Sequence, residues 1–152
     1  MTFREISLVK TSFALVAPTS AQATAIFYAR LFELDHTLRP LFRGDMVAQG
    51  QKLMQALALV TNSLDQLDTI LPEVKQLGIR HARYGMNEGH YATVGAALLW
   101  TLEKNLGPAL TPEVRAAWTN AYLMLASAMM AAAQDATSAK PRTQRPEIAA
   151  RA

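Results

Sequence analysis

The sequence contains no cysteine among its 152 residues. Disulfide bonds and thiolate metal sites are therefore excluded. The chain has the length of one ordinary domain and can bury a sizeable hydrophobic core. A protein without cysteine fits a reducing compartment, and we expect a cytoplasmic location.

Signatures of several common functions are missing as well. No segment reaches the ~18 apolar residues of a membrane span. Glycine-rich phosphate loops, the H-E-x-x-H zinc motif and the G-x-S-x-G nucleophile elbow do not occur. The three histidines, His36, His81 and His90, are too far apart in sequence to form a local metal cluster. We therefore expect neither a membrane protein nor a hydrolytic zinc enzyme.

The positive charge of the chain is concentrated near its C-terminus. The net charge is +3, and residues 134–152 contain four basic and two acidic residues, which leaves +1 for the rest. No dense basic patch with interleaved aromatic residues is found, so we expect no nucleic-acid partner. Two prolines and the lack of a helical stripe predict that residues 134–152 form a mobile basic C-terminal tail.

Apolar residues recur at helical spacing through most of the chain, and no sustained alternation of period two is found. The stretch "SFALVAPTSAQA" resembles a cleavable leader, but its apolar run is short and Glu5 precedes it, so we favour an amphipathic first helix. Further helices are predicted over 18–35, 46–64, 71–85, 89–107 and 111–133. The fold class is therefore all-α, with roughly six to eight helices.

Polar residues, prolines and a glycine mark the ends of these predicted helices. Thr19 or Ser20 is a suitable N-cap for the second helix, and Thr111 is one for the last. Pro72 fits a first helical position, and Gly85 fits the C-terminal end of the same helix.

Four residues on or beside these helices are of the types that a pocket for a flat, iron-bearing ring needs. His81 lies on an apolar face, where a neutral imidazole could bond iron. Gln49 shares an apolar face with Leu53 on the preceding helix, Tyr28 adds a phenol, and Phe42 adds an aromatic wall. Spacing alone leaves a second interpretation open. A histidine on an apolar face is more often a core residue, and a buried glutamine or tyrosine is often only a hydrogen-bonded polar group.

Several ordered segments together resemble globins over about residues 4–133. "FYARLF" and "LRPLF" resemble the second helix and the following corner of bacterial single-domain haemoglobins and flavohaemoglobin haem domains. "QGQKLM" resembles their distal helix, and "LGIRHARYG" resembles their proximal segment and that of neuroglobins. "HYATVGAALL" and the neuroglobin-like "LGPALTPEVRAAW" resemble the last two helices. The resemblance implies a globin domain over residues 1–133, folded around non-covalently bound haem b.

Carried over residue by residue, the resemblance implies that His81 is the proximal ligand of the haem iron and the metal-binding residue. Tyr28 and Gln49 would be the distal pair that donates hydrogen bonds to bound dioxygen. Leu53 would limit the distal space, and Phe42 would pack on the ring.

The same resemblance implies further haem contacts. Lys52 would pair with a haem propionate, and Arg80 would either reach a propionate or lie on the solvated side of its helix. Tyr91 matches the proximal tyrosine of flavohaemoglobins, and Val94 is a further contact on the same predicted helix. His90 has a second interpretation as the iron ligand, but we expect a polar residue at the corner before that helix.

One departure from flavohaemoglobins bears on function. The glutamate that accompanies their proximal tyrosine falls at Ala133, so we expect a weaker electron push through His81 and less peroxidase-like character. The resemblance implies reversible binding of dioxygen and other diatomic gases at a five-coordinate ferrous iron, in a monomer or weak homo-oligomer. The alternatives are a nitric-oxide dioxygenase served by an external reductase, because we expect no attached reductase domain, and a redox or gas sensor.

Overall fold

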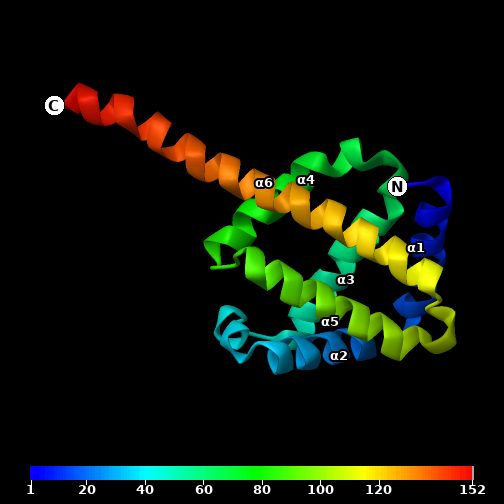
Figure 1. Ribbon diagram of the computed structural model, residues 1–152. Helices are drawn as coiled ribbons and strands as arrows, with labels where there is room; N and C mark the ends of the chain where they lie inside the picture. The colour runs from blue at the N-terminus through cyan, green and yellow to red at the C-terminus, as the bar shows by residue number, and fades with distance from the viewer. Residues whose placement is uncertain (152) are drawn as a thin grey trace.

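The computed structural model describes the backbone of residues 1–151 and the side chains of residues 1–138. Six α-helices and four short 3₁₀ segments follow one another along this part of the chain (Figure 1). They are α1 (Phe3–Val16), η1 (Ala17–Thr19), α2 (Ser20–Leu34), η2 (His36–Leu41), α3 (Met46–Asn62), η3 (Leu64–Gln66), α4 (Leu67–Arg83), α5 (Glu88–Leu106), η4 (Gly107–Ala109) and α6 (Pro112–Arg151). Every regular element within residues 1–151 is a helix, which confirms the all-α prediction.

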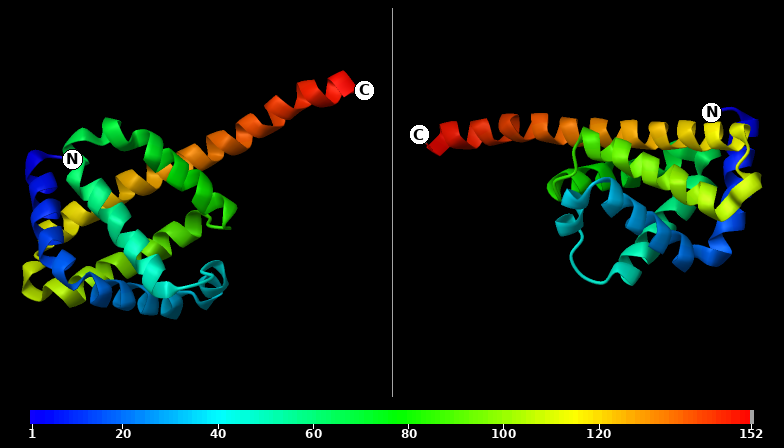
Figure 2. Two further views of the ribbon diagram at one scale, coloured as in Figure 1. Left: turned by 180° about the vertical axis from the view of Figure 1, so that it is seen from behind. Right: turned by 60° about the horizontal axis from the view of Figure 1, so that its bottom comes forward.

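The helices pack around one core. α6 packs against α4, α1 and α5, and α2 packs against α5 and α3. In the right-hand view of Figure 2, α6 runs along one side of the molecule, and α2 and η2 lie on the other. All six helices contribute buried side chains, of which Leu31 and Val9 are the largest that are fully enclosed. A buried hydrogen bond of 2.8 Å from Trp118 Nε1 to Ser12 Oγ joins α6 to α1 inside this core.

The predicted start of the last helix is confirmed, and that of the second is only partly so. α6 begins at Pro112, and Thr111 Oγ1 accepts a hydrogen bond of 3.2 Å from the Val114 amide. Thr19 does precede α2, but its hydroxyl donates to the Val16 carbonyl at 3.1 Å and caps nothing. Because the 3₁₀ turn η1 precedes α2, the Val16 carbonyl lies within reach of the Thr19 hydroxyl. The bond to this carbonyl takes the place of the expected cap.

α4 begins earlier than the sequence predicted. It starts at Leu67, so Pro72 lies inside the helix rather than in its first turn. A proline inside a helix removes one backbone hydrogen bond. The upstream turn is retained because Ile70 is buried in the core and Leu67 packs against the same core. Burial of these side chains therefore outweighs the local preference of proline.

The last helix extends well past the predicted end at residue 133, because α6 is helical as far as Arg151 (Figure 1). The side chains of residues 139–152 lie outside the described residues, and the mobile basic tail over 134–152 stays a prediction. Although α6 has 40 residues, no described helix combines the length and the apolar character needed to cross a membrane.

Candidate functional site

The side chain of His81 is held in one tautomer by its own helix. His81 lies half-buried in the last turn of α4, and its Nδ1 is 2.7 Å from the Leu77 carbonyl oxygen. A carbonyl only accepts hydrogen bonds, so Nδ1 carries the proton and Nε2 keeps its electron pair. Burial, aided by the charge of Arg80, lowers the pKa of His81, and the bond to Leu77 opposes this shift only partly. The imidazole is therefore neutral at neutral pH and can bind a metal through Nε2.

The end of α4 fixes the backbone around His81 as well. Gly85 follows the helix with a φ of 97°, a left-handed conformation that glycine adopts without strain. The Met86 amide donates to the His81 carbonyl at 3.0 Å, and the Gly85 amide donates to the Ala82 carbonyl at 3.1 Å. These two bonds form a Schellman motif, which confirms Gly85 as the predicted helix stop.

The two predicted distal residues come from different helices and interact. Tyr28 on α2 is only 7% exposed, and burial raises the pKa of its phenol. The nearby polar side chain of Gln49 on α3 acts in the opposite direction and lowers this pKa. Because burial dominates, the phenol stays protonated at neutral pH and can donate a hydrogen bond. The pair thus combines a buried hydroxyl donor with a partly buried amide donor.

A close crossing of α2 and α3 explains why Tyr28 and Gln49 meet. Gly50 follows Gln49 directly, and a Cβ atom at Gly50 would lie 2.7 Å from Thr24 Oγ1. Thr24 is four residues before Tyr28, so it lies on the same side of α2. A side chain at position 50 would therefore collide with Thr24 where the two helices that carry the pair cross.

An aromatic cluster surrounds the Tyr28 ring. The ring centroids of Phe27 and Phe42 are 5.0 and 5.4 Å from that of Tyr28, both in edge-to-face geometry. Phe32 stacks on Tyr28 at 6.1 Å and contacts Phe42 at 5.6 Å. Phe32 was not among the residues predicted for the site, although its position four residues after Tyr28 places both on one face of α2. The phenol therefore lies in apolar surroundings that keep water away from it.

The remaining predicted contacts differ in burial. Leu53, one turn after Gln49, and Val94 on α5 are partly buried against the core, whereas Lys52 and Arg80 are exposed. Exposure fits groups that would reach an anion at the protein surface, and it equally fits a solvated helix face. Among the described residues, no hydrogen bond or aromatic contact joins His81 to the cluster around Tyr28.

His90 has a structural role at the start of α5. Its Nδ1 accepts a hydrogen bond of 3.1 Å from the Asn87 amide, and its own amide donates to Asn87 Oδ1 at 3.2 Å. This reciprocal capping box gives His90 the predicted polar role, but in the first turn of α5 and not at the corner before the helix. Within the part of the chain that the structure describes, no group of three or more histidine, cysteine or acidic residues could hold a metal ion.

The backbone of Tyr91 is held by Tyr122, a residue that was not predicted for the site. Tyr91 is buried near the start of α5, and its carbonyl accepts a hydrogen bond of 2.5 Å from the Tyr122 hydroxyl on α6. Burial, with a smaller contribution from Tyr91, raises the pKa of Tyr122 far above its usual range. Tyr122 also closes tightly on α5, since a Cβ at Gly95 would lie 2.8 Å from its ring. Only the fold reveals this link, because Tyr91 and Tyr122 are far apart in sequence.

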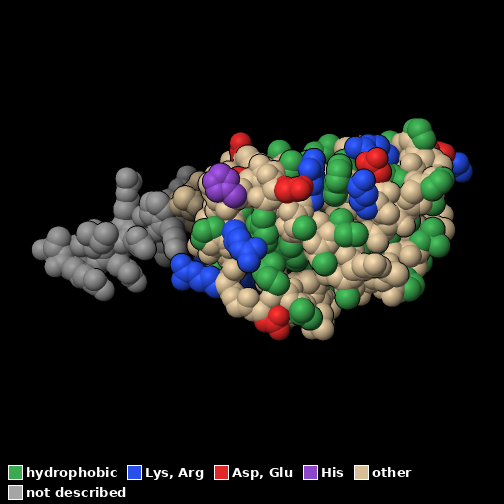
Figure 3. All heavy atoms as spheres, turned by 90° about the horizontal axis from the view of Figure 1, so that it is seen from below, with side chains coloured by type: hydrophobic (Ala, Val, Ile, Leu, Met, Phe, Trp, Pro, Cys, Tyr) green, Lys and Arg blue, Asp and Glu red, His purple; other side chains and the backbone are tan. Residues whose placement is uncertain are grey.

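The surface offers two further features, neither of which involves the predicted residues. Figure 3, seen from the side of α2 and η2, shows basic side chains interspersed with acidic and hydrophobic ones. The Arg30 guanidinium and the Lys104 ammonium lie 4.0 and 4.4 Å from the centroid of the Trp100 ring.

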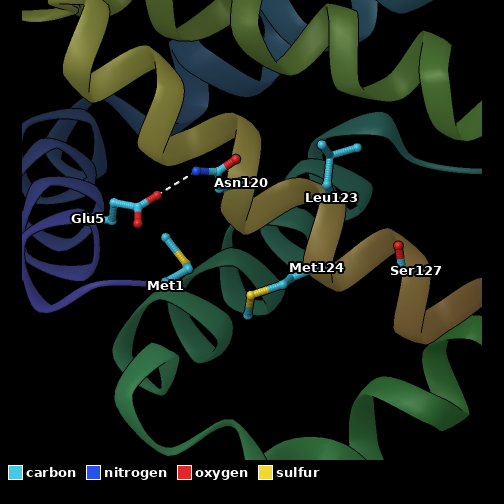
Figure 4. Close-up of a pocket in the computed structure, with 6 residues that line it drawn as sticks. All are labelled: Met1, Glu5, Asn120, Leu123, Met124 and Ser127. Atoms are coloured by element: carbon cyan, nitrogen blue, oxygen red, sulfur yellow. Dashed lines mark hydrogen bonds between the residues drawn. The ribbon is translucent and has the colours of Figure 1, made fainter.

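A pocket of about 490 Å³ lies between the start of α1 and α6 (Figure 4). It is lined by Met1, Glu5, Asn120, Leu123, Met124 and Ser127.

Solved structures identify the arrangement of these helices as the globin fold. A bacterial globin from Campylobacter jejuni superimposes with a TM-score of 0.80 at 23% identity, covering 90% of this chain and 99% of that one. An engineered carbene transferase, made from a candidate nitric oxide dioxygenase of Rhodothermus marinus, superimposes with a TM-score of 0.83 at 26% identity. That likeness covers 93% of this chain and 99% of the other.

The sequence comparisons go further than the fold. The globin family model matches residues 25–129, so the chain belongs to the globin family. It is 30% identical over 135 residues to a flavohemoprotein of Bacillus subtilis, covering 87% of this chain and 34% of the relative. It is also 30% identical over 140 residues to the neuroglobin of Danio rerio, covering 83% of this chain and 88% of that protein. The chain thus spans about a third of the flavohemoprotein's length.

Proposed function

We propose that this globin binds haem b non-covalently and takes up dioxygen and other diatomic gases reversibly. The bound haem would supply a ferrous iron as the gas-binding atom. The residues fit that group, because His81 presents a neutral imidazole with an unprotonated Nε2. Tyr28, which is buried, and Gln49, which is partly buried, add two hydrogen-bond donors.

Each residue has a distinct task in this proposal. His81 binds the iron through Nε2, while the bond from Nδ1 to Leu77 sets the orientation of the ring and strengthens it as a ligand. Tyr28 and Gln49 direct an O–H and an N–H group at the partial negative charge of a diatomic ligand. The aromatic neighbours of Tyr28, including Phe42, exclude water from these donors.

The fixed tautomer of His81 is the observation that carries the proposal, and it leads to a direct test. We expect His81→Ala to lose haem, or to retain it only with added imidazole, in optical spectra of the purified and reduced protein. His90→Ala is the matched control, because His90 caps α5 and should leave the spectra unchanged. Full haem retention and parental spectra in His81→Ala would show that His81 is not the ligand.

A second candidate function is nitric-oxide dioxygenation with a separate reductase. It is supported by the likeness to a flavohemoprotein and to the engineered form of a candidate nitric oxide dioxygenase from Rhodothermus marinus described above. A single reaction of the gas-loaded protein with nitric oxide does not separate the two functions, since many globins react in this way. Sustained consumption of nitric oxide with a reductase and a nicotinamide cofactor would favour the enzyme. Consumption that stops after one equivalent would favour reversible gas binding.

A further inference from the structure

The helix that carries His81 contains a glycine at its closest approach to α6. Gly78 is buried in the middle of α4, three residues before His81. A glycine inside a helix weakens that helix relative to alanine, so its presence calls for a local reason. A Cβ at this position would lie 2.2 Å from the Met129 carbonyl oxygen and 2.6 Å from the Met129 Cα. The backbones of α4 and α6 therefore touch at Gly78.

This contact differs from the other tight glycines of the chain. At Gly50 and Gly95 the nearest atoms belong to the side chains of Thr24 and Tyr122, which can rotate or shift. At Gly78 the three nearest atoms all belong to the Met129 backbone, and α6 is held in place by α1 and α5 on its other sides. A new methyl group would have to move α4 itself. The shift needed is about 1 Å, because ordinary van der Waals contact begins at 3.4 Å.

A shift of α4 would move the imidazole as one unit with its helix. The Leu77 carbonyl next to Gly78 accepts the hydrogen bond from His81 Nδ1, and the Schellman bonds hold the His81 carbonyl. The imidazole thus has little freedom to compensate for a displaced backbone. Tyr28 and Gln49 are on α2 and α3, so they would stay in place.

We propose that Gly78 is a positioning residue, which sets how far the proximal imidazole reaches toward the distal pair by letting α4 lie directly on the α6 backbone. The proposal rests on the proposed function, in which His81 is the iron ligand. It predicts that filling the space at position 78 changes the bond between the imidazole and the iron, and does more than lower stability.

The test uses the haem-loaded protein and the iron–histidine stretching band in its resonance Raman spectrum. We expect Gly78→Ala to shift this band and to weaken carbon monoxide binding at least about tenfold. Val9→Ala deletes two methyl groups of a fully buried side chain on α1 and controls for general loss of stability, and Gly89→Ala controls for loss of an exposed helix glycine. Both controls should keep the parental band. An unchanged band in Gly78→Ala, or an equal shift in Val9→Ala, would overturn the proposal.

The backbone origin of the contact provides a second, independent check. The double variant Gly78→Ala/Met129→Ala should keep the shifted band, because the Met129 side chain does not contribute the nearest atoms. Return of the parental band would mean that crowding by the Met129 side chain, and not the position of α4 on the α6 backbone, controls the position of the imidazole.

A third measurement does not require Gly78→Ala to fold. In His81→Gly supplied with free imidazole, the ligand is no longer attached to α4, and its band should differ from that of the parent protein. An identical band would refute the positioning role of α4. Parental haem binding by His81→Gly without imidazole would instead refute the proposed ligand, so the two failures are distinguishable.

Discussion

Removal of single donor atoms from the distal pair tests its role most directly. Tyr28→Phe deletes only the hydroxyl and keeps the ring, so the edge-to-face contacts with Phe27 and Phe42 at 5.0 and 5.4 Å are retained. Gln49→Leu replaces the amide side chain with an apolar side chain of similar size. A hydrogen bond of this kind contributes on the order of 1 kcal/mol, which corresponds to about a fivefold faster release of dioxygen for each variant.

The contact between the two side chains makes a further quantitative prediction. The side chain of Gln49 is near enough to the Tyr28 phenol to influence its pKa, so removing one of the two changes the surroundings of the other. The fold-increase in the rate of dioxygen release should therefore be smaller in the double variant than the product of the two single fold-increases. Groups in direct contact typically show a coupling of at least about 0.5 kcal/mol in such a cycle.

The assay is the displacement of dioxygen by carbon monoxide in a stopped-flow instrument, with the parent, both single variants and the double variant. Tyr84→Phe is the matched control, because it deletes the same atom from an exposed tyrosine at the end of α4. Unchanged release rates in both single variants would show that the pair does not face the bound gas. Strictly multiplicative effects would show that the two donors act independently.

Three further predictions concern the spectrum, the pH dependence and the core. Gln49 supplies an amide, which is a poor ligand for ferrous iron, so the reduced protein should lack the sharp low-spin spectrum of bis-histidine coordination; such a spectrum would contradict our assignment. The pKa of His81 is lowered in the folded state from 6.5, so the unfolded chain binds the extra proton first as the pH falls. The haem-free protein should lose unfolding free energy below about pH 6.5 more steeply than His81→Ala does, and identical pH profiles in urea titrations would refute this. Ser12→Ala leaves the buried Trp118 N–H without its acceptor and should cost about 1–3 kcal/mol in urea unfolding, whereas a loss within error would show that water replaces the hydroxyl.

The sequence predicted the helices well where their ends are encoded locally. Thr111 starts a helix and Gly85 ends one through bonds made within a few residues, so the pattern alone was sufficient. Pro72 was misjudged, because the turn before it is retained by burial of Ile70 in a core that no local pattern describes.

The site shows the same division between local and long-range information. The bond from His81 to Leu77 follows from helical spacing of four residues. The meeting of Tyr28 with Gln49 depends on the helix crossing at Gly50, and the link from Tyr122 to the Tyr91 carbonyl depends on how α5 lies on α6. The resemblance to globins suggested which residues matter, but only the fold shows what fixes them.

The bond from the Met86 amide to the His81 carbonyl has a consequence for isotope exchange. This amide lies between α4 and α5, in a segment where exchange with deuterated water would ordinarily be fast. Its hydrogen can exchange only when the last turn of α4 opens, so one NMR signal measures the free energy of that local opening. Comparing this signal with and without haem would show how much of the order around His81 exists before the cofactor arrives.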